Sequence, residues 1–240
     1  MIPHPWLAAL AALLAATLAA VTGFGGAAVL LPVLVAIFGV RAAIPILTVA
    51  QLIGNGSRVW FNRSELDWKI VGWFAVGAIP CGILGGLLFT AAPIPILLRL
   101  LGIFLLGVVA WRRLRPGPMP KVPARGFAGI GGAAAFLSAL VGSVGPVMAP
   151  FFLAAGLVKG SYIGTEALAT VVMHLAKLGA YRAGSALPWS AVAAGLALGP
   201  AMIAGSWVGK RIVDRLPERV FIAIIELTMV GAGLVFLVRA

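Results

Sequence analysis

The sequence predicts an all-α, polytopic membrane protein built from two inverted repeats, each with a glycine-broken first segment followed by three spanning helices. Composition is the first reason: 62% of the 240 residues are hydrophobic and 10% are charged, whereas a soluble domain carries roughly 25% charged residues. The second is that apolar residues gather in stretches near the roughly 20 residues that a spanning helix needs. The third is an internal repeat, in which Pro80 is matched by Pro200 and Gly85 by Gly205, 120 positions on.

The apolar stretches are of two lengths. Six hold 18–23 residues and are predicted to be single spanning helices, whereas the first and the fifth hold 33 and 32 residues. Those two are too long for one span and too short for two spans with a turn. The stretches are 6–38, 43–61, 68–89, 94–111, 126–157, 160–182, 188–209 and 218–238.

Both long stretches carry helix-weakening residues in the middle. Non-helical backbone at membrane depth is tolerated only where protein or a cavity surrounds it. The pattern therefore predicts two re-entrant hairpins of half-helices, the second halves starting near Gly26 and Pro146. The residues concerned are Gly23, Gly25 and Gly26 in the first stretch, and Gly142 and Gly145 with Pro146 in the fifth.

Loop charge favours these hairpins. With the basic linker Arg112–Arg125 in the cytoplasm, two re-entrant stretches place 13 Lys and Arg inside and 5 outside, whereas two full crossings place 11 inside and 7 outside. Basic loops are retained in the cytoplasm, so the re-entrant arrangement is preferred and the halves have opposite orientation. The expected division is 1–111 for the N-terminal repeat, 112–125 for the cytoplasmic linker and 126–240 for the C-terminal repeat.

Charge and cysteine content exclude other classes. The net charge of +12 would suit nucleic acid, but the basic residues lie mainly in short loops between apolar stretches, so the expected partner is the bilayer. Cys81 is the single cysteine, which leaves no intrachain disulfide and no cysteine metal site. A cleaved signal peptide is not expected, because the first apolar run has neither a basic start nor a small-residue cleavage site.

The glycine breaks are the first candidate site. A half-helix N-terminus offers free N–H groups and a positive dipole end, which together attract an anion. The simpler alternative is that these glycines only permit tight packing or a kink, but the breaks hold corresponding places in the repeat. The substrate-binding residues expected here are Gly23, Gly25, Gly26, Gly142, Ser143 and Gly145.

Two polar stripes are the second candidate. Thr48, Gln51, Asn55 and Arg58 share one face of the stretch 43–61, and Glu166, Thr170, His174 and Lys177 share one face of 160–182. Ionisable groups within a membrane are costly, so function is the default hypothesis, and a structural hydrogen-bond network is the alternative. Gln51, Asn55, His174 and Lys177 are expected to assist substrate binding.

Proton coupling is expected to involve Glu166, His174 and Glu226, the last of which lies in the middle of the final apolar stretch. The sequence contains no paired carboxylates, no nucleophile with a base and no metal-ligand cluster. We therefore expect no enzyme activity, no cofactor and no metal.

The chain resembles the TauE/SafE family of membrane permeases over essentially its whole length. The features that carry the resemblance are the element Gly23-Phe24-Gly25-Gly26 with Pro32, its echo Gly142-Ser143-Val144-Gly145-Pro146 with Pro150, the runs Leu66-Asp67-Trp68 and Leu187-Pro188-Trp189, and the basic linker. The resemblance implies a carrier in the bacterial inner membrane for sulfite, thiosulfate, sulfonates or related small anions. One departure is that the second break lacks the double glycine of the first.

The expected function is a secondary transporter that moves a small anion, sulfite or another sulfur-containing oxyanion or organosulfonate, across the inner membrane by alternating access with proton coupling. A passive anion channel is the alternative. A structural or assembly partner without transport of its own is a further one, and a homodimer is a possible assembly.

Overall fold

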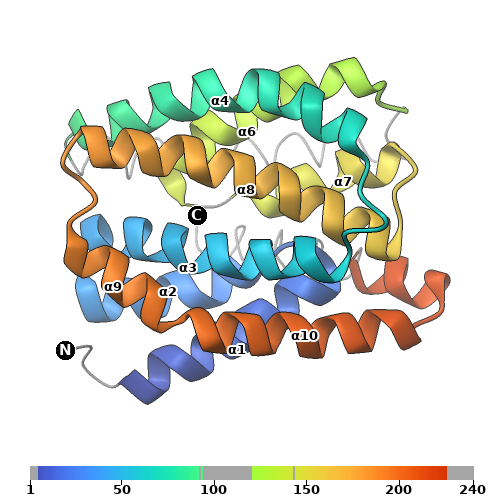
Figure 1. The fold of residues 1–240 in the computed structure, drawn as a ribbon, viewed down its shortest axis with the longest axis horizontal. Helices are drawn as coiled ribbons and strands as arrows, with labels where there is room; N and C mark the ends of the chain where they lie inside the picture. Colours follow the sequence, from blue (N-terminus) through green and yellow to red (C-terminus); the bar gives the residue numbers. More distant parts are fainter. Residues whose placement is uncertain (1–4, 92, 94–120, 143, 226–240) are drawn as a thin grey trace, which may run out of the picture.

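The computed structural model describes residues 5–91, 93, 121–142 and 144–225, and the regular structure within these ranges is helical (Figure 1). The predicted stretch 94–111, most of the linker 112–125 and residues 226–238 of the last stretch lie outside the described residues. Residues 218–225 are helical. The helices are α1 (Pro5–Thr22), α2 (Gly26–Phe38), α3 (Val40–Phe61), α4 (Trp68–Ala91), η1 (Ala124–Gly126), α6 (Phe127–Val141), α7 (Gly145–Ala154), α8 (Lys159–Ala183), α9 (Trp189–Ala197) and α10 (Gly199–Arg215).

The first long stretch is broken at the glycines that predicted the break. Helix α1 ends at Thr22 and α2 begins at Gly26. Between them, Gly23 and Gly25 have φ values of +80° and +90°, which glycine adopts without the strain that a Cβ atom causes. The chain then turns back, so α1 and α2 pack against each other. A Cβ atom on Gly26 would lie 2.7 Å from the Ala15 carbonyl oxygen, so only glycine fits this approach.

The fifth stretch is broken in the same way. Helix α6 ends at Val141, Gly142 has a φ of +88°, and α7 begins at Gly145 with proline in its first turn. Proline suits that position because it has no N–H group to leave unpaired there. Figure 1 shows α7 returning to the end of the molecule from which α6 starts, whereas α1 starts and α2 finishes at the opposite end.

Helices α3 and α8 form the centre and run in opposite directions (Figure 1). Helix α10 packs on α1 and α3, while α4 packs on α6 and α8. Small residues permit the close approaches that helices in lipid use. A Cβ atom on Gly209 would lie 2.8 Å from the Thr17 carbonyl oxygen of α1, and one on Gly85 would lie 2.7 Å from the Phe136 carbonyl oxygen of α6.

The seventh stretch differs from its prediction as one helix over 188–209. The structure divides it at Leu198 into α9 and α10, and α10 continues to Arg215. Pro200 stands in the first turn of α10, where its missing N–H group interrupts the helical hydrogen bonds. The corresponding Pro80 lies inside α4 without ending that helix.

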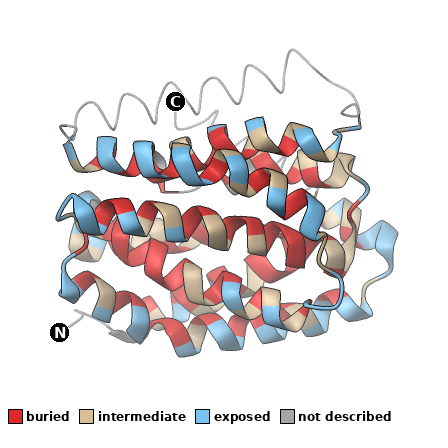
Figure 2. Ribbon diagram, turned by 45° about the horizontal axis from the view of Figure 1, so that its top comes forward, coloured by how far each residue is buried: buried red, intermediate tan, exposed pale blue. Residues whose placement is uncertain are grey.

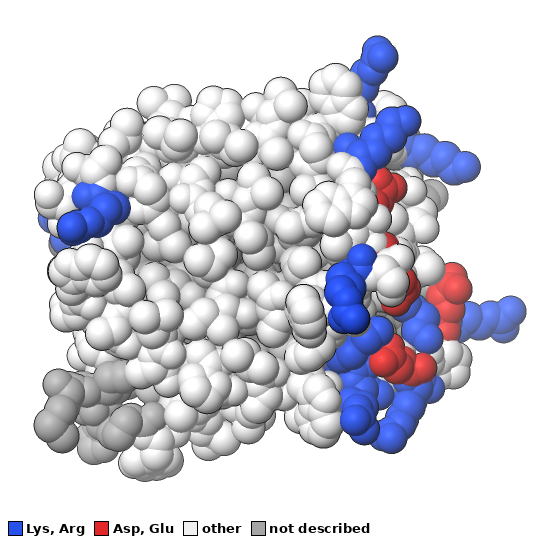
Figure 3. Space-filling model, viewed as in Figure 1, with Lys and Arg blue, Asp and Glu red and all other residues white. Residues whose placement is uncertain are grey.

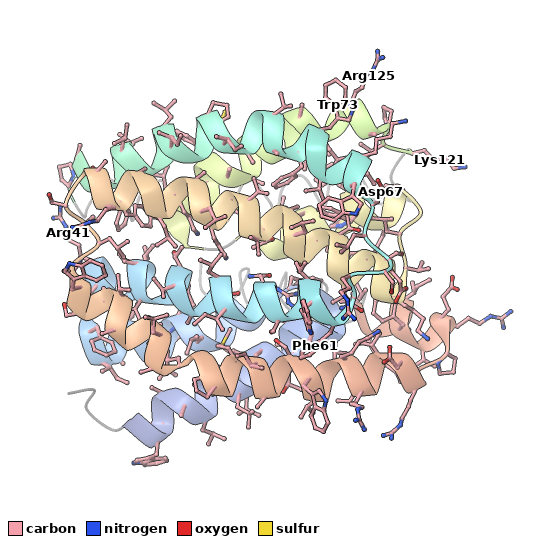
Figure 4. All side chains as sticks on the ribbon, in the orientation of Figure 1. Arg41, Phe61, Asp67, Trp73, Lys121 and Arg125 are labelled. Carbon is pink, nitrogen blue, oxygen red and sulfur yellow. The ribbon has the colours of Figure 1, made fainter. Side chains whose placement is uncertain are left out.

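Charge is distributed very unevenly over the molecule. Figure 3 shows basic and acidic side chains gathered at one end, and Figure 4 places Asp67, Lys121 and Arg125 at that end and Arg41 at the other. The charged end, called here the basic end, is formed by the α3–α4 loop, the residues before α6, the start of α8 and the end of α10. Its described cations are Arg63, Lys69, Lys121, Arg125, Lys159, Lys210, Arg211, Arg215 and Arg219.

The outer faces of the helices between the two ends are apolar. Residues that face inward are buried and those that face outward are exposed (Figure 2), and the exposed ones include Val76, Leu84 and Trp207. By length and composition, two helical stretches in the described part of the chain can cross a bilayer, Trp68–Ala91 and Trp189–Arg215.

Candidate functional site

The two breaks meet at one cavity in the centre of the molecule. This central cavity has a volume of about 30 Å³ and is walled by both breaks together with α3 and α8. A Cβ atom on Gly145 would lie 2.6 Å from Cβ of Phe24, so the breaks are in direct contact. The predicted site residues that line the cavity are Gly23, Gly25, Gly26, Gln51, Gly142, Gly145, Glu166 and His174.

Two helix N-termini border the central cavity. Helix α2 starts at Gly26 and α7 at Gly145, and neither start has a side-chain cap. The first N–H groups of a helix have no partner within the helix. Because both starts border one cavity, their N–H groups and dipoles favour negative charge in the same place.

The first break is held by side chains from both halves. The Thr22 hydroxyl accepts a hydrogen bond from the Phe24 N–H group at 3.3 Å. The Tyr162 hydroxyl on α8 donates to the Thr22 carbonyl at 3.0 Å. The Tyr162 ring also lies directly over Gly23, where it occupies the space that a Cβ atom would need. Sequence spacing did not single out Tyr162, because the bond joins residues 140 positions apart.

Arg58 caps the carbonyl end of α1. Its Nη1 atom donates to the carbonyl oxygens of Ala19 at 2.8 Å and Gly23 at 3.1 Å. The same atom lies 3.4 Å from Glu166 Oε2, an ion pair that joins α3 to α8. A cation at a helix C-terminus is stabilised by the negative end of the dipole. Arg58 also lines the central cavity. The sequence placed it in a polar stripe but not among the expected substrate-binding residues.

Asn55 does not line the central cavity and instead holds Arg58. Its side-chain oxygen accepts a hydrogen bond from Arg58 Nη2, and its amide nitrogen donates to the Gln51 carbonyl at 2.7 Å. The structure therefore places Asn55 behind the cavity wall, where it orients the guanidinium group. Gln51, one helical turn away, does reach the cavity.

Lys177 repeats the role of Arg58 in the other half. It is buried and donates to the Ser138 hydroxyl at 3.0 Å and to the Ser138 carbonyl at 3.4 Å, near the end of α6. Arg58 and Lys177 are 119 positions apart, and so are their acceptors Ala19 and Ser138. Lys177 is not among the residues that line the central cavity, whereas Ser138 is.

His174 is the buried polar side chain that stands out at the cavity. It is 3% exposed, and neither ring nitrogen has a hydrogen-bond partner among the described residues. Leaving a buried donor or acceptor unpaired costs about 1–3 kcal/mol. The imidazole lines the central cavity, so its donor and acceptor are available to an occupant.

Glu166 is the acidic group of the cavity wall. Its Oε1 atom accepts a hydrogen bond from the Thr170 hydroxyl at 2.9 Å, and its Oε2 atom faces Arg58. Two further predicted residues, Ser143 and Glu226, lie outside the described residues. Within the described part of the chain, no three His, Cys, Asp or Glu residues are grouped so as to hold a metal ion.

A family model described as sulfite exporter TauE/SafE matches residues 8–236. Among the curated proteins no match is found. None is found among the solved structures either.

Proposed function

Because this chain belongs to the TauE/SafE sulfite exporter family, whose members are integral membrane transporters of sulfur-containing anions rather than enzymes, we propose that it carries a compact sulfur oxyanion, sulfite first, through the central cavity. The observation that supports this most is that two helix starts without side-chain caps and His174, which has no hydrogen-bond partner among the described residues, converge on one cavity.

The charges around the central cavity suit an anion. Arg58 and Lys177 bring two positive charges within or just behind its wall, and Glu166 brings one negative charge. The helix starts add partial positive charge, each worth about 0.3–1 kcal/mol for a nearby anion and up to about 2 kcal/mol when partly buried. His174 and Gln51 supply side-chain hydrogen bonds to the oxygens of the substrate.

The size of the cavity favours a small substrate. About 30 Å³ is room for only one or two water molecules. An inorganic oxyanion needs less rearrangement of the walls than an organosulfonate such as taurine or sulfoacetate. We therefore rank sulfite and thiosulfate above the organosulfonates.

Alternating access is the proposed mechanism. The two hairpins start from opposite ends of the molecule (Figure 1) and their breaks meet at the central cavity, an arrangement typical of carriers with inverted repeats. In this proposal 1–111 and 126–240 are the repeats, each with three crossings, and one rocks against the other. The protein lies in a bacterial inner membrane, with the basic end and the linker 112–125 on the cytoplasmic side. The concentration of Lys and Arg in these two regions supports this orientation.

Proton coupling is the second part of the proposal. Glu166 and His174 both line the central cavity, so a substrate oxyanion there is close to both groups. Glu226 is retained as the third candidate. If replacing all three by neutral residues leaves sulfite transport with the pH dependence of the wild type, coupling through these groups is wrong.

The test is a flux assay with purified protein in liposomes. Sulfite, thiosulfate, sulfate, sulfoacetate and taurine are supplied in turn, with and without a proton gradient. We expect saturable sulfite flux with unchanged sulfite recovered on the far side. Flux that does not saturate and far exceeds carrier turnover would instead support a passive channel, and absence of flux for every anion would overturn the proposal.

Alanine variants of two glycines, one at a break and one away from the breaks, make the assay specific to the breaks. Gly26→Ala places a methyl group against the Ala15 carbonyl, whereas Gly179→Ala meets nothing within 4 Å. We expect the first variant to lose most sulfite flux and the second to retain it. Thermal unfolding of both proteins in detergent separates loss of transport from loss of folding.

A further inference from the structure

A second cavity lies between the central cavity and the basic end. It is a crevice among α1, α3, α8 and α10, and its polar lining consists of Arg58, Asn62, Ser206 and Lys210. Arg58 lines both this basic-end crevice and the central cavity. In this state the crevice has no room for a water molecule. Phe61, the last residue of α3 and one of the apolar wall residues, lies on the side of α3 toward α10 (Figure 4).

The polar side chains of the crevice come from α3, from the residue after its end and from α10. Ser206 is 1% exposed and donates to the Gly54 carbonyl at 3.2 Å. Asn62 donates to the Arg58 carbonyl at 2.8 Å. Lys210, at the mouth, has a side chain that is 22% exposed and pairs with Asp214 at 2.7 Å. Each cation also has a structural partner, Glu166 for Arg58 and Asp214 with Glu65 for Lys210. Beyond these pairs, both cations line the same crevice.

We infer that the basic-end crevice is the closed passage by which the anion moves between the central cavity and the basic end, with Arg58 at its inner gate and Lys210 at its mouth. This inference rests on the proposed function. Clefts lined by one sign of charge concentrate oppositely charged ligands, so the two cations draw the anion along the passage.

The contacts at Arg58 explain how the gate is closed. Arg58 binds the end of α1 and contacts Glu166 of α8 at 3.4 Å, which is long for an ion-paired hydrogen bond. Tyr162, which stands beside the wall residue Ile163, ties α8 to the same end of α1. The passage opens when the start of α8 moves away from α1, and an anion arriving at Arg58 replaces the carboxylate as its partner.

Cysteine labelling tests the passage independently of any substrate. Since Cys81 is the single cysteine, Cys81→Ala gives a cysteine-free protein, into which Ser206→Cys is placed. The matched control is Ala78→Cys, which is fully buried in α4 and borders neither cavity. Both proteins are held in nanodiscs, where both ends are accessible, and are treated with a sulfonatoethyl methanethiosulfonate and with its trimethylammonium analogue.

We expect Ser206→Cys to react with the anionic reagent at least about tenfold faster than Ala78→Cys, and faster than it reacts with the cationic reagent, because the cations of the crevice concentrate anions. Labelling as slow as that of the control, or a preference for the cationic reagent, overturns the inference. Either result stands even if the wild type carries no sulfite, in which case it is the proposed function that fails.

Two neighbouring cations of α10 test the mouth of the basic-end crevice. Lys210→Ala removes a crevice cation, whereas Arg211→Ala removes the neighbouring charge, which stacks on Trp207 outside the crevice. We expect Lys210→Ala to raise the half-saturating sulfite concentration about three- to tenfold through lost attraction, Lys210→Arg to restore it, and Arg211→Ala to leave it unchanged. Equal effects of the two alanine variants would assign the result to the overall charge of this end and overturn the role of the crevice.

Discussion

The two glycine breaks are built alike but held differently. The first is fixed by side chains from both halves, through Arg58 of α3 and Tyr162 of α8. The second is fixed within its own half, because Lys177 and Tyr181 of α8 bind Ser138 and Ala139 of α6. Among the described residues, polar contacts between the halves hold the first break and continue to α10 and the α3–α4 loop, where Ser206 donates to Gly54 and Lys210 lies 3.9 Å from Glu65. These are the contacts that must move for the passage to open.

The neighbours of the two turning glycines both come from the other half of the chain, but they differ in polarity. The space beside Gly23 is filled by the Tyr162 ring of the other half, whereas Gly142 faces apolar side chains of α2 and α3 at 3.6–3.8 Å from the position of an added Cβ. The first break is held by polar contacts between the halves, from Arg58 to Glu166 and from Tyr162 to Thr22, which are together called here the polar latch. The second break packs against apolar side chains. The following predictions test this difference in order of expected effect.

Removing Arg58 is expected to have the largest effect. Arg58→Met leaves Glu166 buried without its cation, and breaking a buried pair in this way costs about 3–5 kcal/mol. Lys177→Met removes the bonds from Lys177 to Ser138, whose carbonyl still accepts from the Gly142 N–H group, and is expected to cost less. Thermal unfolding in detergent measures both variants. Adding Glu166→Gln to Arg58→Met is expected to recover part of the loss, and strictly additive losses would contradict a latch between the halves.

Alanine at the turning glycines gives the second comparison. Both positions have positive φ, which costs an alanine about 1–2 kcal/mol. Gly23→Ala also drives a methyl group into the Tyr162 ring, while Gly142→Ala makes only ordinary contacts. We therefore expect Gly23→Ala to lower the unfolding temperature and the sulfite flux more than Gly142→Ala does. Equal losses at the two positions would show that the ring does not hold the first break.

Asn55 and His174 are counterparts 119 positions apart, and they give the third comparison. Asn55→Ala removes a partner of Arg58 and is expected to lower stability by about 1–3 kcal/mol. His174→Ala removes a side chain without hydrogen-bond partners among the described residues, so stability is expected to change little while sulfite flux falls. Thermal unfolding and flux are measured on both proteins. A large loss of stability in His174→Ala would mean that the imidazole is structural.

The sequence predicted the breaks well because their cause is local. Glycine and proline act on the backbone at their own positions, so the start of α2 was predicted at Gly26, where it is found, and the start of α7 at Pro146, one residue from Gly145. Helical spacing also put the polar residues of α3 and α8 on one face each. Helical spacing does not predict which helix packs against each of these faces. The packing of neighbouring helices decides that Asn55 accepts a hydrogen bond from Arg58 and that Lys177 caps α6.

Contacts between distant residues were not predictable in the same way. Tyr162 binds Thr22 and Arg58 meets Glu166 across 140 and 108 positions. Helical spacing marked Arg58 and Glu166 as members of two polar stripes, but no local pattern paired them, and none marked Tyr162. The division of the seventh stretch at Leu198 was missed for another reason. Pro80 and Pro200 occupy corresponding positions, yet only Pro200 stands where one helix gives way to the next.

Sulfite binding by His174 is the most direct test of the central cavity. The unfolding temperature is measured against sulfite concentration for the wild type, His174→Ala and the control Leu175→Ala, whose residue is 55% exposed on the outer face of α8. A ligand at 100 times its dissociation constant stabilises a protein by about 2.7 kcal/mol. We predict that sulfite raises the unfolding temperature of the wild type and of Leu175→Ala but not of His174→Ala. An equal rise in all three proteins would contradict a substrate site at the meeting of the two breaks.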